Sequence, residues 1–179
     1  MLNIIRHYVR VVDVINRTIG RITMYGIFVM MGLLLYSSIS KSFFTPSLWT
    51  LEMAQFAMAA YYMLGGAYSM QLGSHVRMDL LYGRWTLRGK AFMDTLTALC
   101  LVTYLSFLLY GAFSSTGYAI QYNETSYSAW SPYMAPIKMV MTFGIVLMIL
   151  QTISIFFKDL GRVLGWDVLP GSDESEEVI

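Results

Sequence analysis

Residues that could do chemistry are scarce in this chain of 179 residues. It contains two histidines, His7 and His75, and a single cysteine, Cys100. The sequence has no pair of cysteines, no His-x-x-x-His pattern and no glycine-rich phosphate loop. Because catalysis and metal binding need several polar groups that converge, we predict no catalytic residue, no bound cofactor and no metal site. The pattern is not that of an enzyme.

The composition excludes several further classes of protein. Hydrophobic residues make up 56% of the chain and charged residues only 13%, whereas a soluble domain carries about 25% charged residues. This balance disfavours a soluble enzyme, a nucleic-acid-binding protein and a disordered linker. It is typical of a membrane protein, whose first partner is the lipid bilayer.

Four charge-poor runs mark the predicted membrane spans. They cover residues 22–40, 53–74, 95–117 and 139–157. A helix of 19 residues is about 28 Å long, close to the thickness of the bilayer's hydrocarbon core. All four prolines fall outside these runs, as expected because lipid offers no replacement for a lost backbone hydrogen bond. We predict an all-α integral membrane protein, with four transmembrane helices in one domain over residues 1–165.

The basic residues set the predicted orientation. Ten of the twelve Lys and Arg lie before the first span, between the second and third, or after the fourth; the exceptions are Lys41 and Lys138. By the positive-inside rule, both chain ends are predicted to be cytoplasmic. Residues 166–179 are rich in acids and are predicted to form a disordered cytoplasmic tail.

The first 21 residues have their own pattern. Their charged residues recur at helical spacing on one face: Arg6, Arg10, Asp13 and Arg17. Apolar residues occupy the opposite face, which favours an amphipathic helix lying along the inner leaflet. A signal peptide fits less well, because the following apolar run is long and no small-x-small cleavage site is present.

Ionisable residues are absent from the interior of the predicted spans. Glu52 lies at the outer start of the second span and Asp94 at the inner start of the third. An intramembrane charge is the usual mark of a solute pathway, so this chain is predicted to assist a transport partner instead of forming a pore. Glu52 has two interpretations, an acid that complements the helix dipole or a contact with another subunit.

Small and amide side chains suggest close helix packing. Gly65, Ser69 and Gly73 form a small-xxx-small stripe, and Gly111 with Ser115 forms a shorter one. Such stripes let helices approach closely in lipid, and the neighbour can be this chain or a partner subunit. Two further polar residues in the spans, Gln71 and Gln151, are predicted to bridge helices.

The most unusual local sequence follows the second span. It runs from His75 through Arg77 and Asp79 to Leu81. His and Arg suit a helix C-terminus, and Asp79 can pair with Arg77 or Arg84, so a capped inner turn is favoured over a ligand site.

In this context the chain resembles the small membrane subunit of tripartite ATP-independent periplasmic (TRAP) transporters, the DctQ-type family. The resemblance covers roughly residues 1–165, with four spans in the expected order. It rests on these features: Asn16 and Gly20, Trp49-Thr50-Leu51-Glu52, Gly65-Gly66-Ala67, His75-Val76-Arg77-Met78-Asp79, Glu124-Thr125-Ser126, Pro136, Gly144 and Gln151. One departure is Lys41-Ser42-Phe43-Phe44, where the family often has an Arg-Tyr-x-Phe pattern.

The resemblance implies a function. In such systems a periplasmic binding protein delivers an organic anion, commonly a carboxylate, to a two-part complex in the bacterial inner membrane. The large subunit works as an elevator and holds the sodium and substrate sites, while the small, multi-pass subunit braces the scaffold. Trp49, Glu52, Glu124 and Trp130 are then expected near the binding-protein side. Arg77 and Asp79 are expected to stabilise the cytoplasmic turn.

Two other functions remain in competition. A membrane anchor subunit of a redox enzyme complex would hold haem or quinone, but no histidine lies in the middle of a predicted span. A small multidrug transporter would need a membrane-embedded acid for proton coupling, and the predicted spans contain none.

Overall fold

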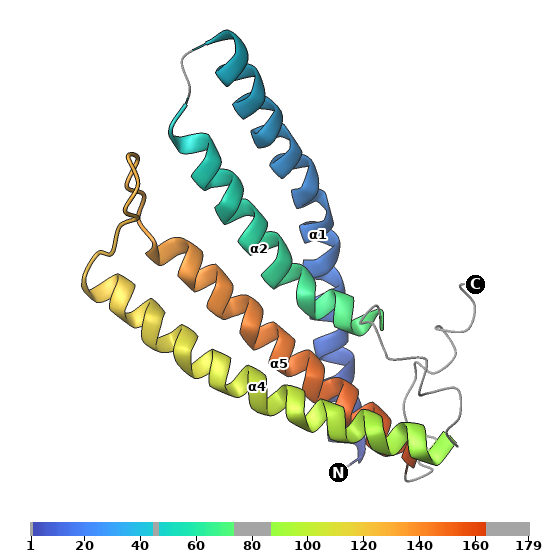
Figure 1. Cartoon of the computed structure of the whole chain (residues 1–179). Helices are drawn as coiled ribbons and strands as arrows, with labels where there is room; N and C mark the ends of the chain where they lie inside the picture. Colours follow the sequence, from blue (N-terminus) through green and yellow to red (C-terminus); the bar gives the residue numbers. More distant parts are fainter. Residues whose placement is uncertain (1, 45–46, 74–86, 164–179) are drawn as a thin grey trace.

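Four long helices form the part of the chain that the computed structural model describes, namely residues 2–44, 47–73 and 87–163 (Figure 1). They are α1 (Leu2–Phe43), α2 (Trp49–Gln71), α4 (Leu87–Gln121) and α5 (Ala135–Val163). The connection between α4 and α5 contains an isolated bridge between Thr125 and Tyr133, and these described residues hold no strand. The prediction of an all-helical protein is confirmed.

The helices are arranged as two pairs. α1 packs against α2 and α4 packs against α5, while contacts between α2 and α5 join the pairs. α5 also contacts α1, so it packs against each of the other three helices. Figure 1 shows the two pairs converging toward the end of the molecule where the N-terminus lies.

The contacts between helices define their relative directions. Across α1 and α2, Gly20 meets Tyr68 and Ser37 meets Thr50, so these two helices are antiparallel. Across α2 and α5 the register is parallel, as shown by the contacts Met63–Gly144, Gly66–Met148 and Met70–Thr152. The first residues of α2 and α5 therefore lie at the same end of the molecule.

Among the described residues, three helices are long and apolar enough to cross a membrane. The candidate spans are Ile5–Phe43, Leu96–Gln121 and Ala135–Lys158. α2 has 23 residues and is not among the candidate spans. Length and composition therefore support three of the four predicted spans.

The N-terminal segment is not a separate helix. The structure joins it to the first predicted span in the single helix α1, which has 42 residues. The sequence contains no proline before Pro46, so the backbone hydrogen-bond ladder continues without a break. Gly20 lies within this continuous helix as well. A Cβ at this position would clash with the side chain of Tyr68 in α2, so the glycine lets the two helices approach.

The helices also extend beyond several predicted boundaries. α4 continues to Gln121, four residues past Gly117, and α5 starts at Ala135 instead of near Met139. Charge-free runs measure the hydrocarbon thickness, whereas a helix continues into the polar interface. The connection between α4 and α5 is therefore shorter than the sequence predicts.

Glycine permits the closest approach between α2 and α5. A Cβ placed on Gly144 would lie 2.8 Å from the carbonyl oxygen of Met63 in α2. Backbone cannot move aside as a flexible side chain can, so this position accepts only glycine without a shift of one helix. Gly111 in α4 faces open space, with nothing within 4 Å of such an atom.

These two glycines provide a matched test of the packing. We expect Gly144→Ala to destabilise the protein by about 1–3 kcal/mol, the usual cost of overpacking, because α2 and α5 must separate. Gly111→Ala should leave the apparent melting temperature in detergent unchanged or slightly raised. Equal melting temperatures for the two variants would contradict the close approach.

Candidate functional site

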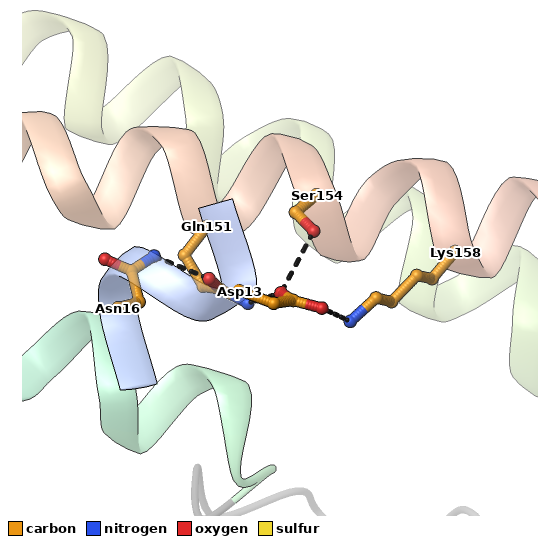
Figure 2. Close-up of polar contacts among 5 residues, drawn as sticks. All are labelled: Asp13, Asn16, Gln151, Ser154 and Lys158. Atoms are coloured by element: carbon orange, nitrogen blue, oxygen red, sulfur yellow. Dashed lines mark hydrogen bonds and ion pairs between the residues drawn. The ribbon is translucent and has the colours of Figure 1, made fainter. Parts of the chain in front are cut away.

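The main polar contacts between helices lie where α1 crosses α5. Figure 2 shows five residues, which we call the α1–α5 cluster: Asp13, Asn16, Gln151, Ser154 and Lys158. Lys158 Nζ pairs with Asp13 Oδ2 at 2.6 Å, and Gln151 Nε2 donates to Asp13 Oδ1 at 3.1 Å. Asn16 Nδ2 donates to Gln151 Oε1 at 2.6 Å, while Ser154 Oγ lies 3.4 Å from Asp13 Oδ1.

Most of these contacts are shielded from solvent. Asn16 is 1% exposed, and Gln151 and Ser154 are 0% exposed. The side chains of Asp13 and Lys158 keep about a fifth of their surface, at 21% and 24%. The Asp13 carboxylate accepts from an ammonium, an amide and a hydroxyl, so its charge is compensated at the edge of the buried amides.

One acceptor in the cluster is left over. Asn16 Oδ1 is buried and has no hydrogen-bond partner among the described residues. Gln71 Oε1 in α2 is in the same condition. The antiparallel register of α1 and α2 places Gln71 about level with Asn16.

Tyr8 shows how α1 passes α5. Its hydroxyl donates to the carbonyl oxygen of Leu150 at 3.2 Å, and its ring meets the ring of Phe157 edge-on at 6.4 Å between centroids. Tyr8 is five residues before Asp13, yet it contacts α5 at Leu150, eight residues before Lys158. The first turns of α1 therefore cross α5 and stay level with its last turns.

The cluster's chemistry is that of a helix contact. In the described part of the chain no three His, Cys, Asp or Glu residues come together as metal ligands. The amides, hydroxyl and ion pair hold α1 to α5 at one crossing point. This arrangement can fix an interhelical angle.

The predicted site residues occupy several places. Gln151 bridges α1 and α5 within the cluster, whereas Gly65 faces α1, where a Cβ placed on it would lie 3.9 Å from Thr23. Ser69 is half-buried in α2, and Gly73 lies beyond the end of α2 with φ +65°. The stripe from Gly65 to Gly73 is therefore not one continuous helix surface. His75, Arg77 and Asp79 lie outside the described residues.

The remaining predicted residues gather at the other end of the helices. Trp49 begins α2 and its ring lies 5.7 Å from that of Tyr36. Glu52 follows in the first turn, with one carboxylate oxygen buried and without a partner in the described chain. In the α4–α5 connection, Glu124 forms an ion pair with Lys138 of α5.

Sequence reasoning missed the packing role of four members of the cluster. Asp13 is expected on the charged face of an amphipathic helix, and Asn16 enters only as a feature of the resemblance. Ser154 and Lys158 receive no role in packing. One signal was available, because Asp13 is the only acid in α1. Its partner could not be identified, since Lys158 lies 145 residues away.

The long apolar helices define the class first, an all-helical membrane protein. The family model of the tripartite ATP-independent periplasmic transporters, DctQ component, matches residues 30–162. The chain belongs to this family, the small component of TRAP transporters, and the predicted resemblance is confirmed. No curated protein and no solved structure gives a significant match to the chain. The matched range includes Gln151 and Lys158 but begins after Asp13.

The ion pair of the cluster can be tested by removing one partner. Lys158→Met leaves the Asp13 carboxylate without its counter-charge, and we expect a loss of about 1–2 kcal/mol because the pair is only partly exposed. Asp13→Asn combined with Lys158→Met should recover much of this loss. Lys41→Met, which removes an exposed lysine, is the control.

Apparent melting temperatures in detergent provide the measurement. The expected order is wild type and Lys41→Met highest, the double variant next and Lys158→Met lowest. A double variant less stable than Lys158→Met would show that the Asp13 charge stabilises the protein even without Lys158.

Proposed function

We propose that this chain is the non-catalytic scaffold subunit of a TRAP importer in a bacterial inner membrane. A large elevator-type subunit carries the sodium and substrate sites, and a periplasmic binding protein delivers an organic anion of the carboxylate class. The family match carries this proposal. The positions of the lysines in the described ion pairs support it, because Lys138 lies in the first turn of α5 and Lys158 is the last residue of the candidate span Ala135–Lys158.

The proposed topology has four crossings with both chain ends in the cytoplasm. α2 is the second crossing, since it runs antiparallel to α1 and parallel to α5. Its lower hydropathy suits a helix with protein on two sides. The basic residues support this orientation by the positive-inside rule, and residues 1–165 then form one membrane domain.

The exposed apolar surface supports the proposal that lipid or a partner subunit covers the helices. Large side chains on α1 and α4 are widely exposed, for example Phe28 at 62% and Phe107 at 75%. α4 contacts α5 on one side, and Gly111 opens onto empty space on another. In the proposed complex the large subunit covers part of this surface.

Reconstitution tests the division of labour. The small subunit alone in proteoliposomes should show no sodium-driven uptake of a carboxylate, and uptake should require the large subunit and the loaded binding protein. The two membrane subunits should also purify together. Robust uptake by the small subunit alone would falsify the scaffold function.

The α4–α5 connection is proposed as part of the surface that receives the binding protein. Asn123 and Ser131 adopt left-handed backbone conformations, with φ 48° and 47°. With the Glu124–Lys138 ion pair, they hold this connection in a defined shape. Tyr127 lies fully exposed in it and Trp130 is 40% exposed, as suits an aromatic contact with a protein partner.

Tyr127 gives a test of this surface. Tyr127→Ala should raise the KM for the loaded binding protein about fivefold, the scale of one interface aromatic, without changing co-purification with the large subunit. Tyr127→Phe keeps the ring and should behave as wild type. An unchanged KM for Tyr127→Ala would remove this connection from the docking surface.

A further inference from the structure

The first half of α1 has three distinct faces. One face is buried against the other helices and contains Val9, Val12, Asn16 and Gly20. A second carries Arg6, Arg10, Arg17 and Arg21, all exposed, which we call the arginine stripe. The third is apolar and exposed: Val11 at 41%, Val14 at 58%, Ile15 at 43% and Ile22 at 68%.

The order of these faces follows from helical geometry. The stripe residues are separated by four, seven and four positions, so they lie along one line of the helix. Successive residues turn by about 100°, which places the stripe between the buried face and the exposed apolar face. An arginine side chain here has protein on one flank and exposed Val and Ile on the other.

The α1–α5 cluster compensates the one acid of α1, which lies close to this stripe in sequence. Asp13 lies three residues after Arg10 and four before Arg17, at the spacing that favours ion pairs within a helix. It is the only acid in α1, and its carboxylate is held by Lys158 of α5. The charge of Asp13 is thus compensated from another helix.

The crossing with α5 places the stripe at the level of the membrane. The Tyr8 hydroxyl reaches the carbonyl of Leu150, inside the candidate span Ala135–Lys158. Arg6 and Arg10 flank Tyr8 in sequence, so they stay near the last turns of α5. A helix that continued straight away from the membrane would not make this contact.

We propose that the arginine stripe and the adjoining apolar face of α1 form a binding surface for anionic phospholipids. Arg6, Arg10 and Arg21 bind the headgroup phosphates, and Val14 and Ile22 contact the start of the acyl chains. Charge complementarity and the exposed apolar flank together favour a lipid over a soluble anion. The assignment of this surface to the inner leaflet rests on the topology given under the proposed function. The preference for anionic lipid does not depend on that topology.

Lipid titration of the full chain tests this surface. Phosphatidylglycerol and phosphatidylcholine are added separately to the detergent-solubilised small subunit, and the rise in melting temperature gives an apparent affinity. We expect phosphatidylglycerol to bind more tightly, with an advantage that shrinks as NaCl is raised. Glycerol phosphate without acyl chains should give no comparable shift.

A triple variant locates the effect. The variant that combines Arg6→Gln, Arg10→Gln and Arg21→Gln should bind phosphatidylglycerol at least tenfold more weakly. Each basic residue near an anionic surface adds to the binding free energy. The same three positions changed to Lys keep the charge and should keep the lipid preference. Neither set touches the α1–α5 cluster, so both proteins should fold.

Three results would overturn the proposal. The first is equal binding of the two lipids by the wild type, and the second is an unchanged preference in the Gln variant. The third is loss of co-purification with the large subunit by the Gln variant while its lipid preference persists, which would assign the stripe to a protein partner. None of these measurements needs transport activity, so the scaffold function is tested separately.

Discussion

The contact between Asp13 and Lys158 is the charged constraint between the two helix pairs, and it acts beside the α2–α5 packing that joins them. α4 and α5 meet through Thr116 and Thr142, whose hydroxyls are 2.9 Å apart. α1 and α2 meet through Ser37 and Thr50. These neutral contacts each act within a pair. The ion pair of Asp13 with Lys158 and the amides beside it instead join the first helix to the last, so together with the α2–α5 packing they fix how the pairs converge.

α5 packs against the three other described helices, and the residues through which it packs are small or can form hydrogen bonds. Gly144 lets the backbone of α2 approach, and Thr152 lies against Met70. Gln151 and Ser154 face α1 on another side. A helix that must pack against three neighbours in lipid gains from short side chains and matched polar groups, because the hydrophobic effect does not draw helices together there.

Much of the fold follows from one-dimensional properties of the sequence. Uncharged runs of about 20 residues become helices because lipid leaves the backbone no other hydrogen-bond partner. The crossing of α1 over α5 could not be predicted in the same way. It depends on Asp13 meeting Lys158 and on Tyr8 reaching Leu150, contacts between residues about 140 positions apart. The continuity of α1 was missed because its polar residues look solvated in the sequence, although Asn16 is buried.

The same crossing gives a reason for the several arginines on the first helix of this small TRAP component. A helix of 42 residues is about 63 Å long, roughly twice the hydrocarbon thickness of a bilayer. If all of α1 pointed along the membrane normal, its first turns would lie beyond the headgroups. Tyr8 and Asp13 hold these turns against α5 instead. In the proposed lipid surface, exposed arginines of these turns meet lipid phosphates while another flank of the helix packs on protein, so one segment would both hold α1 to α5 and set the depth of α1.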